Sequence, residues 1–383
     1  MKVTPPNTIA DFVALRQRLH AVPELSREEA ETSALVAELL SGWGYEVATG
    51  IGGHGVVATL TNGVGERRIG LRADMDALPI SEATNLPYAS GKAGVMHACG
   101  HDGHTTILLA AAKELAETRN FSGTVRLIFQ PAEEVGGAVE MLADGLFERF
   151  PVDAVFGLHN WPGIPAGEFR FIEGPAMAAV DLVIITVRGK GGHGAKPHEA
   201  VDPIVAASAL VMALQSIVAR NVDPLETAVI TVGSIHGGTM PTVIPDSVEL
   251  QATVRTFSAA VRDTIRARIK ALAESIAASH GATAEVYHPE GFPAVINDVY
   301  ATAFARRVAV EAFGAERVGE LKPLLVSEDF AFMLEKQAGS YLFVGNGDSA
   351  DLHSPRYDFN DAVIEPAARY WVRLVEEYLR ANG

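Results

Sequence analysis

The chain has 383 residues, of which 48% are hydrophobic and 20% charged, a composition typical of a globular protein. Because one hydrophobic core rarely extends over so many residues, we expect two domains. The formal net charge of −16 argues against nucleic acid as a partner, since phosphate-binding surfaces are basic. No run of apolar residues approaches the roughly 18 of a membrane span, and the N-terminal segment lacks an apolar leader, so we expect a cytoplasmic protein.

The first half of the chain alternates helical and strand patterns, which predicts an α/β fold. Apolar residues at helical spacing mark a helix over residues 8–20 and a second helix that ends at Gly42–Gly44. Ser26 and Glu29, just before the second helix, have the spacing of an N-terminal capping box. Strands are expected at 45–49, 55–60, 67–72, 123–130 and 153–158, and a further helix is expected to end near residue 118.

The stretch from Met96 to His104, MHACGHDGH, contains the single cysteine of the chain and three histidines. One cysteine cannot form an internal disulfide, so Cys99 serves packing, nucleophilic chemistry or metal binding. An isolated cysteine is most often a small buried side chain. Here, however, thiolate and imidazole groups lie between a polar loop and the start of a helix, which favours a metal site that includes Cys99 and His101.

Three predicted strands of this half end in acidic or imidazole side chains. These side chains are Asp74 and Asp76, Glu133 and Glu134, and His159. Each has a plain alternative, namely an Asp turn or solvated glutamates at a helix start. Together they predict a ligand set at one edge of a sheet, because open α/β sheets place their sites at the carboxyl ends of strands. Adjacent carboxylates make sense where one binds a metal and the other stays free as a base.

The pattern changes near residue 180. Strand, helix, strand, strand, helix and strand follow one another, which is the order of the split ferredoxin-like module. These elements are expected at 181–188, 202–219, 228–235, 248–257, 259–279 and 284–288. We therefore expect residues 181–291 to form an inserted satellite domain, and residues 1–180 and 292–383 to form the catalytic domain. The apolar helices and strand edges of the satellite would suit a dimer interface.

Three further side chains in the second half are candidates for a site. His193 lies in a glycine-rich loop that lacks the residue order of a phosphate loop, and it is either functional or incidental. Arg255, near a strand end, could bind a carboxylate with two hydrogen bonds or could be a surface arginine. His353 lies on a polar loop just after a strand predicted at 341–344, and Ser327 is a candidate cap for a helix.

Seven segments of the chain resemble, in this order, hippurate hydrolases, N-acyl-amino-acid amidohydrolases and plant auxin-conjugate hydrolases. They are LRADMDALPI, MHACGHDGHTT, FQPAEE, GLHN, GKGGHGAKPHEAVDPI, VSEDFAFM and LHSPRYDFND. Those enzymes belong to the aminoacylase/carboxypeptidase group of dinuclear metallohydrolases. The resemblance covers about residues 10 to 380. The cysteine motif is specific, because most of the wider group has Asp at the position of Cys99.

The resemblance implies a zinc-peptidase-like catalytic domain, a mixed sheet flanked by helices, with two divalent metal ions (Mn, Zn, Co or Ni). The implied metal ligands are Cys99 as the bridging thiolate, His101, Glu134, His159 and His353. Glu133 is implied as the general base, and Asp76 as a carboxylate that orients a ligand. His193 would stabilise the oxyanion in the partner subunit of a homodimer, and Arg255 would bind the substrate carboxylate. Related proteins commonly have Asn where this chain has Thr242, which leaves substrate preference open.

We therefore expect a metal-dependent amidohydrolase that cleaves N-acyl amino acids to a carboxylic acid and an amino acid. A dipeptidase or an N-acetyl-diaminopimelate deacetylase on the same scaffold is an alternative. A metal-binding protein without turnover is a second, although the intact Glu133 and His193 argue against it. A cysteine-nucleophile hydrolase is a third, and it would leave Glu134, His159 and His353 without a purpose. The expected partners are a small-molecule substrate and a second copy of the chain, with neither nucleic acid nor membrane.

Overall fold

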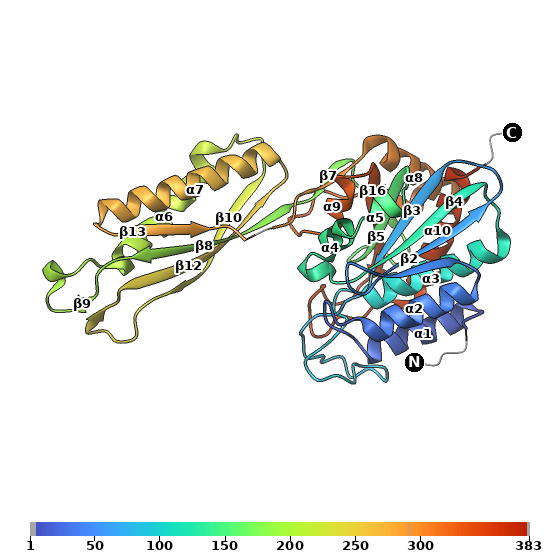
Figure 1. The fold of residues 1–383 in the computed structure, drawn as a ribbon, viewed down its shortest axis with the longest axis horizontal. Coiled ribbons are helices and arrows are strands. Elements are labelled where there is room, and N and C mark those ends of the chain that lie inside the picture. Colours follow the sequence, from blue (N-terminus) through green and yellow to red (C-terminus); the bar gives the residue numbers. More distant parts are fainter. Residues whose placement is uncertain (1–4, 290, 381–383) are drawn as a thin grey trace. The chain divides into compact units, whose positions relative to one another are not determined.

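The computed structural model describes residues 5–289 and 291–380 (Figure 1). The chain divides into two compact units. The first contains the chain up to Ala176, Val295–Lys322 and the chain from Glu328 onward, and the second contains Met177–Ala294 and Pro323–Ser327. The described residues do not include 1–4, 290 and 381–383. Parts of the predicted domain ranges, and of the N-terminal segment predicted to lack a leader, therefore lie outside the described residues. The catalytic and satellite roles of the two predicted domains stay predictions.

The first unit is built on an eight-stranded mixed sheet with the order β1-β2-β4-β3-β5-β16-β6-β15. Its strands are β1 (Glu46–Ile51), β2 (Gly55–Asn62), β3 (Arg68–Asp74), β4 (Gly123–Gln130), β5 (Ala154–Pro162), β6 (Phe169–Phe171), β15 (Val318–Glu320) and β16 (Gly339–Gly347). Strand β3 pairs in parallel with β4 and β5, and β5 pairs in parallel with β16. The carboxyl ends of these four strands therefore lie at one edge of the sheet, as the sequence predicted for three of them.

Helices flank this sheet, and the predicted α/β class is confirmed. They are α1 (Ile9–Ala21), α2 (Ala30–Gly42), α3 (His101–Thr118), α4 (Gly137–Ala143), α5 (Leu146–Arg149), α8 (Val299–Phe313), α9 (Phe330–Leu334) and α10 (Ile364–Tyr378). Short elements of the unit are the 3-10 turns η1 (Glu133–Val135), η3 (Ala315–Arg317) and η4 (Asp361–Val363), and the paired strands β7 (Gly174–Met177) and β14 (Val295–Asn297).

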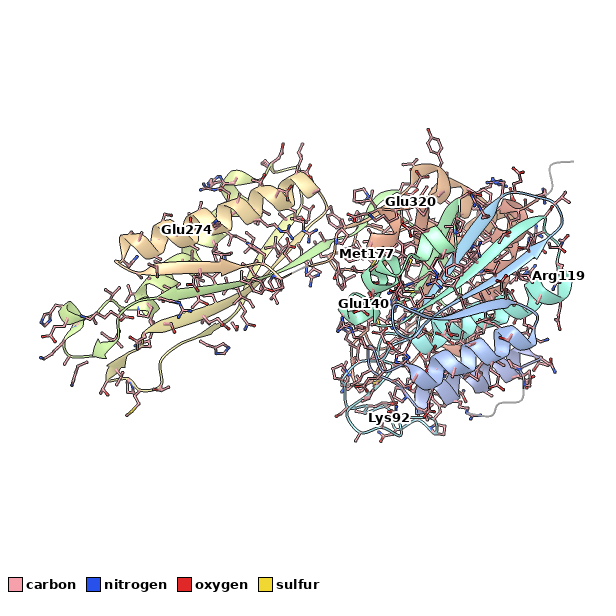
Figure 2. The ribbon with its side chains drawn as sticks, in the orientation of Figure 1. Lys92, Arg119, Glu140, Met177, Glu274 and Glu320 are labelled. Atoms are coloured by element: carbon pink, nitrogen blue, oxygen red, sulfur yellow. The ribbon has the colours of Figure 1, made fainter. Side chains whose placement is uncertain are left out.

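Helix α3, which follows the cysteine motif, is a core helix. Every residue from His101 to Ala112 is buried, and the helix packs against α1 and α10. The polar residues before the motif form a loop in which Lys92 is exposed (Figure 2). Gly100, which precedes α3, has a φ of +90°, and a Cβ there would lie 2.3 Å from the side-chain nitrogen of Asn160. A glycine thus lets the loop turn sharply into the helix.

The second unit is a four-stranded antiparallel sheet with the order β10-β12-β8-β13, covered by two helices. Its elements are β8 (Ala179–Arg188), β9 (Gly192–His193), η2 (Pro197–Glu199), α6 (Pro203–Asn221), β10 (Ala228–His236), β11 (Val243–Ile244), β12 (Ser247–Thr256), α7 (Ala259–Ser279) and β13 (Thr283–Tyr287). Helices α6 and α7 pack side by side and share one core with the sheet. The long elements follow the predicted strand-helix-strand-strand-helix-strand order.

Within the described residues, α6 is long and apolar enough to cross a membrane, judged by length and composition alone. Such a helix is weak evidence of a membrane span, because core helices of soluble proteins pass the same test. The inner face of α6, which includes Ala207, Leu210 and Leu214, is buried in the core of the second unit.

Two predicted helix caps are wrong. Helix α2 has Glu29 itself at the N-cap position, with no hydrogen bond from a capping side chain. The Ser26 hydroxyl instead donates to Asp76 at 2.7 Å. Helix α9 begins after Asp329 rather than at Ser327, whose hydroxyl accepts a hydrogen bond from Arg255 at 3.1 Å. In both cases a tertiary contact replaces the local one.

Candidate metal centre

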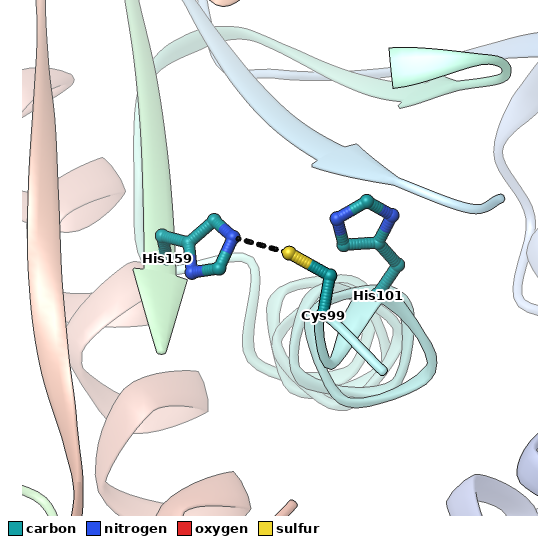
Figure 3. A group of neighbouring side chains, drawn as sticks. All are labelled: Cys99, His101 and His159. Atoms are coloured by element: carbon teal, nitrogen blue, oxygen red, sulfur yellow. Dashed lines mark hydrogen bonds between the residues drawn. The ribbon is translucent and has the colours of Figure 1, made fainter. Parts of the chain in front are cut away.

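A helix start and a strand end bring Cys99 and His159 together. Cys99 lies just before α3, and His159 lies in β5. The Cys99 sulfur points toward His159, and its Sγ lies 3.3 Å from His159 Nε2 (Figure 3). One ligand atom each from Cys99, His101 and His159 lies within 4.8 Å of the others. All three side chains are buried.

Glu134 and His353 form a second group around the same sulfur. Ligand atoms of Cys99, Glu134 and His353 also lie within 4.8 Å of one another. His353 Nε2 is 3.3 Å from Glu134 Oε1, and the His353 backbone has a left-handed φ of 62°. Cys99 belongs to both groups, so two neighbouring cation positions would share its sulfur. The structure therefore brings together all five side chains that were predicted as ligands.

Hydrogen bonds fix the orientation of both buried imidazoles. His159 Nδ1 donates to the Asn160 backbone carbonyl at 2.6 Å. His101 Nδ1 lies 2.9 Å from the Asp76 backbone carbonyl and 3.1 Å from the Asp76 carboxylate. His101 Nε2 is buried and has no hydrogen-bond partner among the described residues. A cation would satisfy that nitrogen, and a carboxylate or carbonyl behind the opposite nitrogen is the arrangement typical of metal-bound histidine.

His104 and Asp74 lie beside these ligands, but their polar atoms are already paired within the protein. His104 Nδ1 lies 2.7 Å from Asp74 Oδ1, and its Nε2 accepts hydrogen bonds from the backbone and side-chain nitrogens of Asn160, both at 3.0 Å. Asp74 Oδ2 pairs with Arg72 at 2.6 Å. Because no lone pair of His104 is left, it supports the site rather than binding a cation.

Glu133 lies next to the ligand groups in an acidic, buried setting. Its Oε2 is 4.0 Å from His101 Nε2, and one carboxylate oxygen each from Glu133, Glu328 and Asp329 lies within 4.8 Å of the others. Burial, and then the charge of Glu328, raises the pKa of Glu133 well above its usual range. A carboxyl group in this setting has an increased affinity for protons, which a general base needs.

A buried arginine balances the acidic cluster behind Glu133. Arg72 Nη1 pairs with Asp74 at 2.6 Å, and its Nη2 pairs with Glu328 at 2.9 Å and Asp329 at 3.1 Å. Its Nε donates to Gln130 at 2.8 Å. Arg72 is buried, and so are these four partners. One guanidinium thus joins β3, β4 and the start of α9.

We expect Arg72→Met to destabilise the protein by about 3–5 kcal/mol, because removal of one partner leaves buried carboxylates without a counter-charge. Arg68→Met is a matched control on the same strand, since Arg68 pairs with Asp153 at the surface with its side chain 39% exposed. The control should cost about 1 kcal/mol or less. Urea unfolding of both variants measures the difference, and equal losses would contradict a special role for the buried arginine.

Of the three predicted site residues of the second unit, His193 and Thr242 lie close together and Arg255 lies apart. His193 in β9 pairs with Val243 in β11, and the neighbouring Gly194 N–H donates to the Thr242 carbonyl at 2.8 Å. Arg255 lies opposite Val180, whereas the end of β8 nearest His193 is Arg188. The intervening strand places Arg255 roughly 25 Å from the end that carries His193 and Thr242. Within this unit, His193 and Arg255 cannot contact one small substrate.

Sequence reasoning did not single out several residues around the predicted ligands. These are Arg72, His104, Glu328 and Asp329. The acidic pair in the segment VSEDFAFM was a visible signal, because two adjacent acids precede a buried helix start. Its partner Arg72 lies about 250 residues earlier in the chain, at a separation of 256 positions from Glu328. No local pattern reveals such a pairing.

Comparison with known proteins places the chain in a family. A profile of peptidase family M20/M25/M40 matches residues 70–377. The chain belongs to this family. It is 45% identical to a hippurate hydrolase of Campylobacter jejuni over 372 residues, 97% of each chain. It is 42% identical to an N-acetyl-L-cysteine deacetylase of Bacillus subtilis over 373 residues, 97% of this chain and 89% of the relative.

A solved M20 structure is similar over nearly the whole length. It is a Bacillus subtilis protein described as a dinuclear metal-binding peptidase, 34% identical, with a TM-score of 0.85 over 97% of this chain and 98% of that one. The M20 membership and these relatives confirm the predicted fold class and the prediction of a metal-dependent amidohydrolase.

Proposed function

We propose that this M20 protein hydrolyses the amide bond of N-acyl amino acids and releases a carboxylic acid and an amino acid. The observation that carries the proposal is the pair of donor groups that share Cys99, with the buried carboxyl group of Glu133 beside them. The relatives named for hippurate and for N-acetyl-L-cysteine support an N-acyl amino acid as the substrate class.

The donor set fits two divalent cations. Thiolate, imidazole and carboxylate together accept Zn, Mn, Co or Ni, and metal supply decides among them. Cys99 would be shared between the two ions, His101 and His159 would bind through Nε2, and Glu134 and His353 would complete the set. Bound there, the cations would supply Lewis-acid chemistry, lowering the pKa of the attacking water and polarising the amide carbonyl.

Different residues of the chain would transfer the proton, orient a metal ligand and bind the substrate. Glu133 accepts the proton of the attacking water and returns it to the leaving amine nitrogen. Asp76 holds the ring of His101 in its binding orientation. Arg255 is the proposed partner of the substrate carboxylate, with the planar geometry for a two-point contact. Thr242 offers one hydroxyl and a short reach, so it would influence which substrate is preferred.

A second copy of the chain is the proposed partner. Strand β10 lies at an edge of the four-stranded sheet and exposes Ile235, and α6 exposes Val205 and Met212. An uncovered strand edge beside apolar side chains supports association. His193 would stabilise the oxyanion in the site of the partner subunit, which agrees with its distance from Arg255 within one copy. A cytoplasmic location stays a prediction from the sequence.

One observation favours a second candidate, a hydrolase with Cys99 as the nucleophile. Cys99 and His159 are 3.3 Å apart, and the His159 ring is oriented by a carbonyl. Burial, however, raises the pKa of the Cys99 thiol and lowers that of His159 well below its usual range. Both shifts disfavour the thiolate–imidazolium pair that such an enzyme needs. The metal-dependent reading also accounts for Glu134 and His353.

Hydrolysis of N-acetyl, N-benzoyl and indole-acetyl amino acids, with metal content measured on the same sample, tests the proposal. We expect amino acid release that a chelator abolishes and Mn²⁺ or Zn²⁺ restores. A cysteine nucleophile would instead be insensitive to the chelator and blocked by a thiol-alkylating reagent. Cleavage of dipeptides or N-acetyl-diaminopimelate alone would move the substrate class, and metal binding without any turnover would overturn the proposal.

A further inference from the structure

The segment between α1 and α2 reaches the metal centre with two side chains. Ser26 Oγ donates to Asp76 Oδ2 at 2.7 Å, across 50 positions of the chain. Glu29 Oε1 accepts from the backbone N–H of Ala132 at 2.7 Å, across 103 positions, and from that of Arg27 at 3.0 Å. These are the two residues whose spacing imitates a capping box, and both contacts end beside predicted ligands.

Asp76 connects Ser26 with two of the predicted ligands. Its Oδ1 lies 3.1 Å from His101 Nδ1, and its Oδ2 accepts both from Ser26 and from the Glu134 N–H, the latter at 3.2 Å. The Ser26 hydroxyl therefore restrains rotation of the Asp76 carboxylate. That carboxylate in turn holds the ring of His101, whose free nitrogen is the one available to a cation.

Glu29 holds the turn that presents Glu133 and Glu134. Ala132, the residue before them, has a left-handed φ of 55°, which is unfavourable for a residue with a Cβ. Its N–H is bound by Glu29, and its carbonyl accepts from Gly137 at 2.8 Å. These two contacts keep the backbone in an unfavourable conformation that a free loop would leave.

Glu29 is a poor choice for stability alone. The side chain is fully buried, and its Oε2 has no hydrogen-bond partner among the described residues. Burial raises the pKa of Glu29 to about 7, because the charged form is removed from water. An apolar side chain of similar size would avoid this penalty but would leave the buried Ala132 N–H without its acceptor. The position that Glu29 imposes on Ala132 accounts for its presence.

We propose that Ser26 and Glu29 are positioning residues of the metal centre. Ser26 acts through Asp76 on His101, and Glu29 acts through the backbone of Ala132 on Glu133 and Glu134. The inference rests on the proposed function. It adds that the segment between the first two helices, rather than only the strand ends, determines the geometry of the site.

Two pairs of variants test each contact in the full-length protein. Ser26→Ala removes the hydroxyl and Ser26→Thr keeps it, while Glu29→Leu removes the acceptor and Glu29→Gln keeps an oxygen for the same two N–H groups. Glu28→Gln, an exposed neighbour, is the control. Four quantities are measured: the Mn²⁺ dissociation constant by competition with a chelator, kcat and KM for N-benzoylglycine, and the unfolding temperature of the metal-free protein.

We expect Ser26→Ala to weaken Mn²⁺ binding about tenfold and Glu29→Leu to lower kcat at least about tenfold, within the range known for residues that orient metal ligands. Ser26→Thr, Glu29→Gln and the control should stay within about threefold of the unmodified protein. KM should change less than kcat in Glu29→Leu, because the substrate contacts are untouched.

A lower unfolding temperature of the metal-free variants with unchanged Mn²⁺ affinity and kcat would overturn the inference, since that result describes a structural role. If Glu29→Leu does not fold, the comparison of Ser26→Ala with Ser26→Thr alone tests the inference. If the unmodified protein itself fails to bind metal or to hydrolyse the substrate, the proposed function is refuted, and the inference with it. An active unmodified protein with unaffected variants refutes the inference alone.

Discussion

Glu133→Gln is expected to lower kcat for N-acyl amino acids by roughly 10³-fold while the protein still binds metal. The amide has the size of the carboxylate but cannot accept and return a proton. Glu133 lies near His101 without belonging to either donor group that contains Cys99, so the ligand set stays intact. Steady-state kinetics and metal analysis on the same preparation measure both quantities.

Glu148→Gln is the matched control for this experiment, because Glu148 is an exposed glutamate at α5 in the same unit. It should leave kcat unchanged. Full turnover in a metal-loaded Glu133→Gln variant would remove Glu133 from the proton transfer. Loss of metal together with activity would instead make Glu133 a ligand, because one of its carboxylate oxygens also lies within 4.8 Å of ligand atoms of His101 and Glu134.

Replacement of Cys99 separates a shared ligand from a nucleophile. Cys99→Ala is expected to lower both metal content and activity to background, because both donor groups lose their common atom. Cys99→Asp should retain part of both, since a carboxylate can be shared by two cations. A nucleophilic cysteine predicts another pattern, in which neither variant is active and both keep the metal content of the unmodified protein.

The activity and metal content of Cys99→Asp are compared with those of Cys99→Ser, in which a hydroxyl group of nearly the same shape replaces the thiol. As a ligand replacement, serine is harder and less acidic than cysteine, so we expect it to bind metal less well than aspartate does. A Cys99→Ser variant with more activity and more metal than Cys99→Asp would speak against a shared anionic ligand.

Most of the long helices and strands could be predicted from the sequence, because their apolar residues recur with a clear helical or strand period. Strand β4 at Gly123–Gln130 and helix α7 at Ala259–Ser279 lie where the pattern placed them. Strands β3, β4 and β5 pair in parallel, so the predicted side chains at their carboxyl ends lie at one edge of the sheet. Short elements without a period, such as β6 and β15, were not predicted, because three residues carry too little pattern.

The candidate site was predictable where a ligand follows a strand, and less so where a contact spans the chain. Strand ends identified Asp76, Glu133 and His159 as neighbours. The spacing of Ser26 and Glu29 led to the wrong prediction of a capping box, because both side chains form hydrogen bonds with residues far away in the sequence. Side chains such as Ser and Asp can bond either to the nearby backbone or to distant groups. Which partner they take depends on which groups the fold buries beside them, and the local sequence does not show this.

The number of cations bound per chain in the reconstituted protein tests whether two metal ions share Cys99. Calorimetric titration of the metal-free chain with Mn²⁺ or Zn²⁺, together with elemental analysis after dialysis, counts the cations. The two donor groups around Cys99 predict two cations per chain in the unmodified protein and in Glu133→Gln, with both lost in Cys99→Ala. A single cation per chain, or full loading of Cys99→Ala, would contradict a centre built on a shared cysteine.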